Sequence, residues 1–251
     1  MQNALLIGLS RQVALGRELD VVANNIANIN TTGFKADGSL FEEYLSSAAR
    51  TAGAGNRVSF VRDRGTWHDL SAGPTDQTGN PLNVAIDGKA FLAVQTPRGE
   101  RYTRNGSFQI NAQGELVTSE GHQVLGDAGP IRLQPNDRQI TISTDGTVSV
   151  REGAENTDSL RGKLRMVEFG DVRQMQKDGS STFKTADGSQ PAPTTQSRII
   201  QGALEKSNVQ GVIEMTRMIE ITRSYTQIAT LLQQQHELSS SSITKLADVP
   251  H

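Results

Sequence analysis

Near the N-terminus, apolar residues recur with the period of a helix. From Asn3 to about Asn28 there is no Pro, and the apolar spacing places the side chains along one face of an α-helix. We expect the helix to end near Gly33, because Gly after a helix adopts the left-handed conformation without a Cβ clash. The apolar stripe, at spacings of four, three and four, is Leu15, Leu19, Val22 and Ile26.

The C-terminal part of the chain shows a second helical pattern. Ser207 is followed three residues later by Gln210, which is the spacing of a capping box, in which the two side chains bond reciprocally to backbone N–H groups. We therefore expect a helix to start at Ser207 and to fade at the serines of 239–242. Its apolar residues repeat like a coiled-coil seam, and they are Met218, Ile221, Tyr225, Ile228 and Leu232.

Between about Arg57 and Thr185 the pattern changes to short β-branched or aromatic runs separated by turn residues. Asn or Asp followed by Gly supplies the positive φ angles of two-residue hairpins. Such pairs lie between consecutive runs at 87–88, 105–106 and 145–146, where we expect hairpins. The clearest strand runs are 83–86, 91–94, 107–110, 139–142, 147–150 and 164–167.

These patterns predict an α+β protein in which an antiparallel all-β middle domain is inserted between N- and C-terminal helices that pair as a coiled coil. Each helical pattern spans about two heptads, whereas three or four identify a coiled coil from sequence. Two amphipathic helices packed on one globular core therefore remain an alternative. The expected boundaries are 1–35 for the N-terminal helix, 36–56 for a linker, 57–187 for the β domain, 188–203 for a second linker and 204–251 for the C-terminal helix.

Composition narrows the possible functions. Twenty-five Lys and Arg against 27 Asp and Glu give a formal net charge of −2, so no field of one sign is available to hold nucleic acid or an anionic membrane. The sequence has no Cys, which excludes disulfides, zinc-thiolate sites and a cysteine nucleophile. No run approaches the ~18 apolar residues of a membrane span. We expect neither nucleic-acid binding nor membrane insertion and, by the ordinary rules, a cytoplasmic protein.

The sequence offers no catalytic constellation. Its four His, at positions 68, 122, 236 and 251, have no second His or carboxylate at metal-binding spacing. It contains no P-loop, dinucleotide fingerprint or nucleophile elbow. We therefore expect no enzymatic activity, catalytic residue, cofactor or metal site.

Asn24, Asn25 and Asn28 lie beside the N-terminal stripe, although Asn is a poor helix former. One interpretation is a frayed helix end, where the amides cap carbonyls or face water. The other is a helix–helix contact, where a buried Asn reduces stability but fixes register and partner. Both interpretations stay open on the sequence.

Several segments carry a resemblance to a known family. Residues 23–35, Ala-Asn-Asn-Ile-Ala-Asn-Ile-Asn-Thr-Thr-Gly-Phe-Lys, closely resemble the N-terminal signature of the flagellar basal-body rod proteins. Residues 204–209 and 214–225 look like the C-terminal signature of the same family. In the middle, residues 78–88 and 101–108 resemble the β domain that rod and hook proteins share. The opening segment is most similar to proximal-rod members and next to distal-rod members.

The resemblance implies a structural subunit whose terminal helices pair as an axial coiled coil and line the rod, with the β domain facing outward. It implies as partners proximal and distal rod proteins, copies of the same chain and the flagellar type III export apparatus. It places the protein in the periplasm-spanning rod, reached without a cleaved signal peptide, in place of the cytoplasm. The alternatives are a distal-rod subunit and a non-flagellar β-rich binding module that dimerises through its helices. The expected assembly interface is Leu15, Leu19, Val22, Asn24, Asn25, Ile26, Asn28, Met218, Ile221, Tyr225, Ile228 and Leu232.

Overall fold

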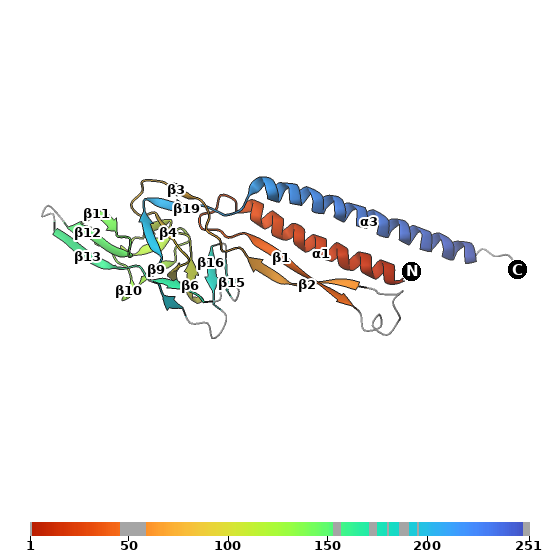
Figure 1. The fold of residues 1–251 in the computed structure, drawn as a ribbon, viewed down its shortest axis with the longest axis horizontal. Helices are drawn as coiled ribbons and strands as arrows, with labels where there is room; N and C mark the ends of the chain where they lie inside the picture. The colour runs from red at the N-terminus through yellow and green to blue at the C-terminus, as the bar shows by residue number, and fades with distance from the viewer. Residues whose placement is uncertain are drawn as a thin grey trace. The chain divides into compact units, whose positions relative to one another are not determined.

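The computed structural model describes residues 2–45, 59–152, 157–170, 175–179, 181–185, 191–194 and 196–247. Helix α1 spans Gln2–Ala27 and helix α3 spans Gly211–Ala247, with antiparallel strands between them (Figure 1). The α+β class with helices at both ends is therefore confirmed. The chain forms two compact units: a helical unit of Met1–Ala27, Asp37–Asp69 and Gln210–His251, and a β unit of Asn28–Ala36 and Leu70–Val209.

The helical unit combines the two helices with a β-hairpin of β1 (Asp37–Leu45) and β2 (Ser59–His68). Within this unit α1 lies between α3 and the hairpin (Figure 1). A Cβ atom on Gly8 of α1 would lie 2.7 Å from Cδ2 of Leu232 on α3, and Arg217 of α3 pairs with Glu18 of α1 at 3.0 Å. The two helices thus pack side by side, and Gly8 permits their close approach.

Asn25 joins α1 to the hairpin. Its Nδ2 donates to the carbonyl oxygen of Asp37 at 2.8 Å, and its Oδ1 accepts from the backbone N–H of Asp37 at 2.8 Å. Asp37 is paired with His68 across the hairpin, and its Oδ1 lies 2.7 Å from Nδ1 of His68. Since Asn25 is fully buried, these bonds replace the water that its amide would otherwise bind.

The boundaries of α3 differ from those expected. The helix begins at Gly211 rather than Ser207, because the Ser207 hydroxyl accepts from the N–H of Val209, two residues on, and the expected capping box does not form. The helix also continues through the serines of 239–242. There the hydroxyl of Ser242 donates to the carbonyl of Leu238 at 2.8 Å, so this hydroxyl is satisfied inside the helix instead of ending it.

Both expected linkers contain strands. Residues 37–45 of the first form β1, while 46–56 lie outside the described residues. The second contains β17 (Ala192–Pro193) and β18 (Arg198–Gln201), and the next strand, β19 (Ala203–Glu205), begins at its last residue. Ile199 of β18 is buried and pairs with Ile86. The β unit therefore extends beyond the expected boundary at 187, since its core takes side chains from β18.

The β unit is built around one large sheet of order β15-β16-β6-β5-β9-β8-β7, with smaller pairings β18-β4, β19-β3 and β11-β12-β13. Its core contains two apolar clusters, one around Leu92 and Val124 and one around Phe91 and Phe183. The remaining strands are β3 (Thr75–Gln77), β4 (Val84–Asp87), β5 (Phe91–Thr96), β6 (Gly99–Thr103), β7 (Phe108–Ile110), β8 (Leu116–Thr118), β9 (Gln123–Gly126), β10 (Gly129–Pro130), β11 (Asp137–Ile142), β12 (Thr147–Glu152), β13 (Thr157–Lys163), β14 (Met166–Glu168), β15 (Gln176–Lys177) and β16 (Thr182–Lys184).

One of the three expected hairpins forms. Gly146, with φ 90°, lies in the turn between the paired strands β11 and β12. The other two expectations are wrong, because β4 pairs with β18 instead of β5, and β7 pairs with β8 instead of β6. Gly106 serves a different purpose there: a Cβ atom on it would lie 1.9 Å from the carbonyl oxygen of Val84, so only Gly permits this contact between backbones.

The three-stranded sheet β11–β13 is held by a buried carboxylate. Arg161 donates through Nε and Nη2 to the two oxygens of Asp137, at 2.8 and 2.5 Å, and also bonds Glu152. The Asp137 side chain is only 2% exposed. The hydrogen bond from Arg161 is the main reason why the pKa of Asp137 lies below its ordinary value.

We expect the Asn25→Leu variant to lose on the order of 2–4 kcal/mol of helical-unit stability, because both backbone groups of Asp37 would lose their partners. Trp67 is the single Trp of the chain and belongs to this unit, so its fluorescence during urea unfolding measures the loss. Asn24→Leu is the control, since Asn24 is exposed. Equal stability of the two variants would contradict the role given to Asn25.

We expect acid to weaken β11–β13. Because the pKa of Asp137 is lowered in the folded protein, its contribution to stability is present above its ordinary pKa and is lost as the pH falls through the folded pKa, from about pH 5 downward. Asp137→Asn should lower amide protection of these strands at neutral pH and flatten its acid dependence, whereas Asp158→Asn, at an exposed pair with Arg151, should not. Hydrogen exchange corrected for intrinsic rates measures both.

Candidate assembly interface

The expected interface residues do not lie on one surface. Val22, Asn25 and Ile221 are buried. Asn24 is exposed, and Met218 and Tyr225 are 39% and 37% exposed. The stripe and seam are thus used largely within the chain, to pack the helical unit. The half-buried members are Leu15, Leu19, Ile26, Asn28, Ile228 and Leu232.

Asn25 is the one of the three amides that is fully buried. It is not solvated, and its amide bonds the backbone of Asp37 in the same chain. The physical reason is that the chain returns as β1 beside the end of α1 and offers a backbone N–H and a carbonyl at the right spacing. Sequence reasoning missed this partner because 36–56 was expected to be a linker.

A different set of apolar side chains on α3 faces outward. Val212, Met215 and Ile219 are 81%, 55% and 54% exposed, and their spacings of three and four place them on one face of the helix. Ile221, two residues after Ile219, is buried on the other side. We call Val212, Met215 and Ile219 the α3 row.

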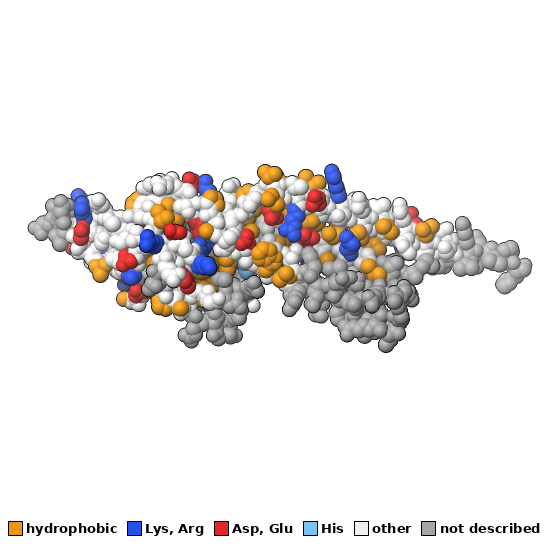
Figure 2. Space-filling model, in the orientation of Figure 1, with side chains coloured by type: hydrophobic (Ala, Val, Ile, Leu, Met, Phe, Trp, Pro, Cys, Tyr) orange, Lys and Arg blue, Asp and Glu red, His pale blue; other side chains and the backbone are white. Residues whose placement is uncertain are grey.

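A matching feature lies on α1. Leu6, Leu9 and Val13 are 48% to 55% exposed and again follow spacings of three and four; we call them the α1 row. Apolar side chains are visible over the region of both helices in the space-filling view (Figure 2). Single exposed apolar residues are ordinary on a protein surface, but contiguous rows mark interaction sites.

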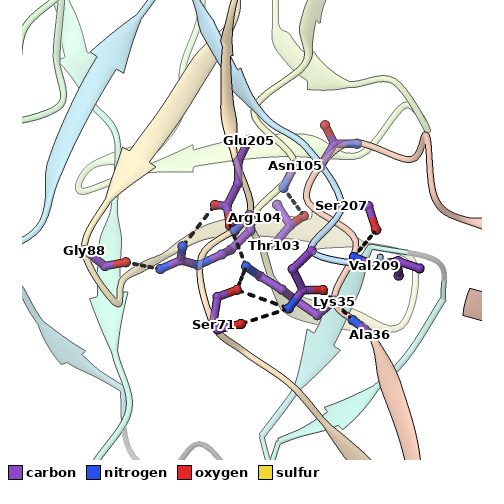
Figure 3. Close-up of polar contacts among 12 residues, drawn as sticks. Lys35, Ala36, Ser71, Gly88, Thr103, Arg104, Asn105, Glu205, Ser207 and Val209 are labelled. Carbon is purple, nitrogen blue, oxygen red and sulfur yellow. Dashed lines mark hydrogen bonds and ion pairs between the residues drawn. The ribbon is translucent and has the colours of Figure 1, made fainter. Parts of the chain in front are cut away.

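Three charged side chains are buried together in the β unit (Figure 3). Nζ of Lys35 lies 2.5 Å from Oε1 of Glu205, and Nη1 of Arg104 donates to Oε2 of Glu205 at 3.0 Å. Each is at most 2% exposed. Lys35 lies in the segment after α1, Arg104 follows β6, and Glu205 ends β19. We call these residues the charge cluster.

Backbone groups add hydrogen bonds to the charge cluster, although Nε of Arg104 is buried without a partner among the described residues. Nζ of Lys35 also donates to the carbonyl of Ser71 at 2.6 Å, and the N–H of Gly73 donates to Oε1 of Glu205 at 3.0 Å. Arg104 also bonds the carbonyl of Gly88. A buried ion pair is tolerated only when such additional hydrogen bonds offset its desolvation. The surrounding carbonyls and N–H groups therefore explain why the charges can be buried here.

Glu168 adds a negative charge near this excess of cations. Its carboxylate accepts from the hydroxyls of Ser197 and Thr194. These bonds, and then the nearby charges of Lys89 and Arg104, hold the pKa of Glu168 below its ordinary value. Glu168 therefore stays ionised at neutral pH and partly balances the charge of Arg104, the member of the charge cluster that lies near it.

The backbone of segment 28–36 is hydrogen-bonded to β19 and to the residues that follow it. The N–H of Gly33 donates to the carbonyl of Glu205 at 2.8 Å, and Gly33 has φ 68°. A Cβ atom there would lie 2.5 Å from the backbone N of Asn105. Gly is therefore required both for the positive φ and for this close approach. The N–H of Ala36 donates to Oδ1 of Asn208 at 2.8 Å. The two segments that leave and re-enter the helices are thus bonded to each other inside the β unit.

Comparison with known proteins matches three family models to separate parts of the chain. They are described as flagella basal body rod protein, over residues 5–35; flagellar hook protein FlgE/F/G D1 domain, over 85–150; and flagellar basal body rod FlgEFG protein C-terminal, over 200–246. The first match ends at Lys35, the second contains Arg104 and the third contains Glu205. Each matched region therefore contributes one member of the charge cluster.

Whole-chain relatives agree with these matches. The chain is 42% identical to the flagellar basal-body rod protein FlgF of Caulobacter vibrioides, over 99% of this chain and 100% of the relative. It is 37% identical to FlgF of Mesorhizobium japonicum, over 98% of each chain. It is 30% identical to the rod protein FlgG of Bacillus subtilis, over 95% of this chain and 97% of the relative.

The chain belongs to the flagellar basal-body rod protein family. The resemblance found in the sequence is confirmed, and the protein is a structural subunit of the bacterial flagellar rod that assembles with other rod subunits. Within the described part of this rod protein, neither helix is long and apolar enough to cross a membrane.

We expect Glu205→Gln to cost about 3–5 kcal/mol of β-unit stability, because it leaves two buried cations without their carboxylate. Lys35→Met should cost less, since Arg104 and the N–H of Gly73 would still neutralise and bond Glu205. The control is Lys206→Gln, which breaks an exposed pair with Asp76 at 2.8 Å and should cost at most about 1 kcal/mol. Thermal unfolding of the full chain, followed by β-sheet circular dichroism, ranks the three. A cost for Glu205→Gln no larger than that for Lys206→Gln would contradict the role of the cluster.

Proposed function

We propose that the chain is a FlgF-like proximal-rod subunit that polymerises with copies of itself and with other rod proteins through α1 and α3. The observation that carries the proposal is the α3 row, three apolar side chains more than half exposed on one helix face. The relatives named FlgF, at 34% to 42% identity, favour the proximal rod. A distal-rod subunit is the second candidate, supported by relatives named FlgG.

The size of the rows suggests how assembly works. Burying three apolar side chains gains roughly 5–9 kcal/mol at about 1.5–3 kcal/mol each. Losing the free motion of a subunit costs about 4–15 kcal/mol. One row against one neighbour is therefore marginal, and a stable rod requires each subunit to use both rows against more than one neighbour.

The distinct positions of the two rows favour an open polymer. A self-complementary patch closes into a dimer, whereas unlike patches joined head to tail continue as a helical filament. In this proposal α1 and α3 line the rod as an axial coiled coil, with half-exposed Met218 and Tyr225 at its edge. Export to the rod by the flagellar type III apparatus, without a cleaved signal peptide, belongs to the same proposal and rests on the family resemblance.

We expect the double variant Met215→Asp with Ile219→Asp to fold with an unchanged melting temperature, because both side chains are exposed in the single chain. It should nevertheless abolish rod assembly and swimming, since two carboxylates would have to be buried between subunits. Leu160→Asp is the control, because Leu160 is 68% exposed on β13 of the β unit. Electron microscopy of basal bodies and soft-agar motility, in cells where the variant replaces the native chain, provide the test. Normal rods in the double variant would overturn the assembly role of α3.

A further inference from the structure

The hairpin of the helical unit carries an apolar face that the sequence patterns did not predict. In its register Gly38 is opposite Trp67, and Leu40 is opposite Gly65. Residues directly opposite, and residues two apart along a strand, point to the same side of a hairpin. These four residues therefore share one face, which we call the hairpin platform. The adjacent pair Asp37 and His68 belongs to the other face.

The hairpin platform is apolar and uncharged. Trp67 and Leu40 are each 48% exposed. The indole lies against Gly38, where a Cβ atom would come within 2.3 Å of Nε1, while a Cβ on Gly65 would meet no atom within 4 Å. The indole ring thus packs against Gly38, and the space above Gly65 is open. A large aromatic presented in this way is the side chain most enriched in binding hot spots.

We propose that the hairpin platform docks the α3 row of a second copy of this chain in the rod. This proposal rests on the polymerisation proposed above and names the surface that receives α3. Both surfaces are apolar and belong to the same helical unit. They are also unlike each other, so their contact is head to tail and propagates instead of closing.

The dimensions of the two surfaces agree. The seven steps along the helix from Val212 to Ile219 rise about 10 Å at ~1.5 Å per residue. The platform extends about 7 Å along its strands and about 5 Å between them, and the indole lengthens it further. A row of three side chains can therefore cover the platform, and Arg217, which lies in the same stretch of α3, is paired with Glu18 of α1.

The single Trp provides a direct test without a label. The full-length chain is concentrated until sedimentation shows polymers, and the emission and acrylamide quenching of Trp67 are compared with those of the monomer. We expect the emission to move to shorter wavelength and the quenching constant to fall at least about twofold, as burial of the indole requires. Polymers in which Trp67 stays as quenchable as in the monomer overturn the platform contact and leave polymerisation intact. A chain that never polymerises overturns both proposals.

A second experiment identifies the occupant. Because the chain has no Cys, a nitroxide can be attached to Thr216→Cys, an exposed position beside the α3 row, in copies that also carry Trp67→Phe. In polymers formed with a large excess of these labelled copies, the native copies should then lose most of their Trp67 emission, since only a neighbouring copy carries the quencher. The control places the nitroxide at Leu160→Cys on β13. Equal emission from the two mixtures, at equal incorporation by sedimentation, would overturn α3 as the occupant.

Discussion

The buried charge cluster is the interaction on which the β unit depends. Glu205 forms ion pairs with Lys35, in the segment after α1, and with Arg104, which follows β6. Both distances are at most 3.0 Å. Removing the carboxylate would leave two cations out of water, which is far more costly than the net gain of the intact pair. Segments separated by 170 residues are therefore united by a requirement that is satisfied only when all three are in place. This makes residues 28–36 part of the β unit, although residues 37–69 separate them from the rest of it in sequence.

The helices take no part in the charge cluster, because its three members all lie in the β unit. The segments that bound them, 28–36 and 205–209, are hydrogen-bonded to each other within the β unit. Within the helical unit, Val22 and Ile221 are buried between elements, whereas Val212 and Val13 face outward. Each helix thus has one apolar face that packs internally and another that is exposed, and the proposed function assigns the exposed faces to neighbouring subunits. An assembly protein needs both, because a helix with one apolar face would have none left once folded.

The sequence predicted the elements better than their partners. Helical periodicity located α1 and the body of α3, and β-branched runs located β4, β5 and β12, because these patterns follow local geometry. The pairing of β4 with β18 was missed, since a two-residue turn signal after residue 86 states only that the chain turns. Strands β1 and β18 were missed because their segments read as linkers, and their burial depends on distant contacts such as that of Ile199 with Ile86.

The same contrast holds for the candidate site, where the apolar faces could be predicted from the sequence and their partners could not. The stripe and seam were correctly recognised as apolar faces, yet periodicity alone cannot distinguish a face packed inside the chain from one left for another subunit. Asn25 was singled out as anomalous, and it is: a fully buried amide in a helix. Its partner, the backbone of Asp37, has no side-chain signature that sequence could reveal. The charge cluster was present in the three segments that carry the resemblance, but each segment shows only one of its charges.

Within the described residues, buried apolar side chains are distributed unevenly between the two units. The β unit has two apolar clusters and the charge cluster. In the helical unit, among the residues whose burial is described, the buried apolar side chains are Ala14, Val22 and Ile221. A helix the length of α1 loses about 1–2 kcal/mol of backbone entropy per residue on ordering, and so thin a seam offsets only part of this. We therefore expect the helical unit to be the part of the chain that opens at least cost. Contacts that cover the two rows and the hairpin platform would order it further at the moment of joining the rod. A subunit whose assembly surface is secured only by its neighbours has little tendency to associate before it meets a growing end.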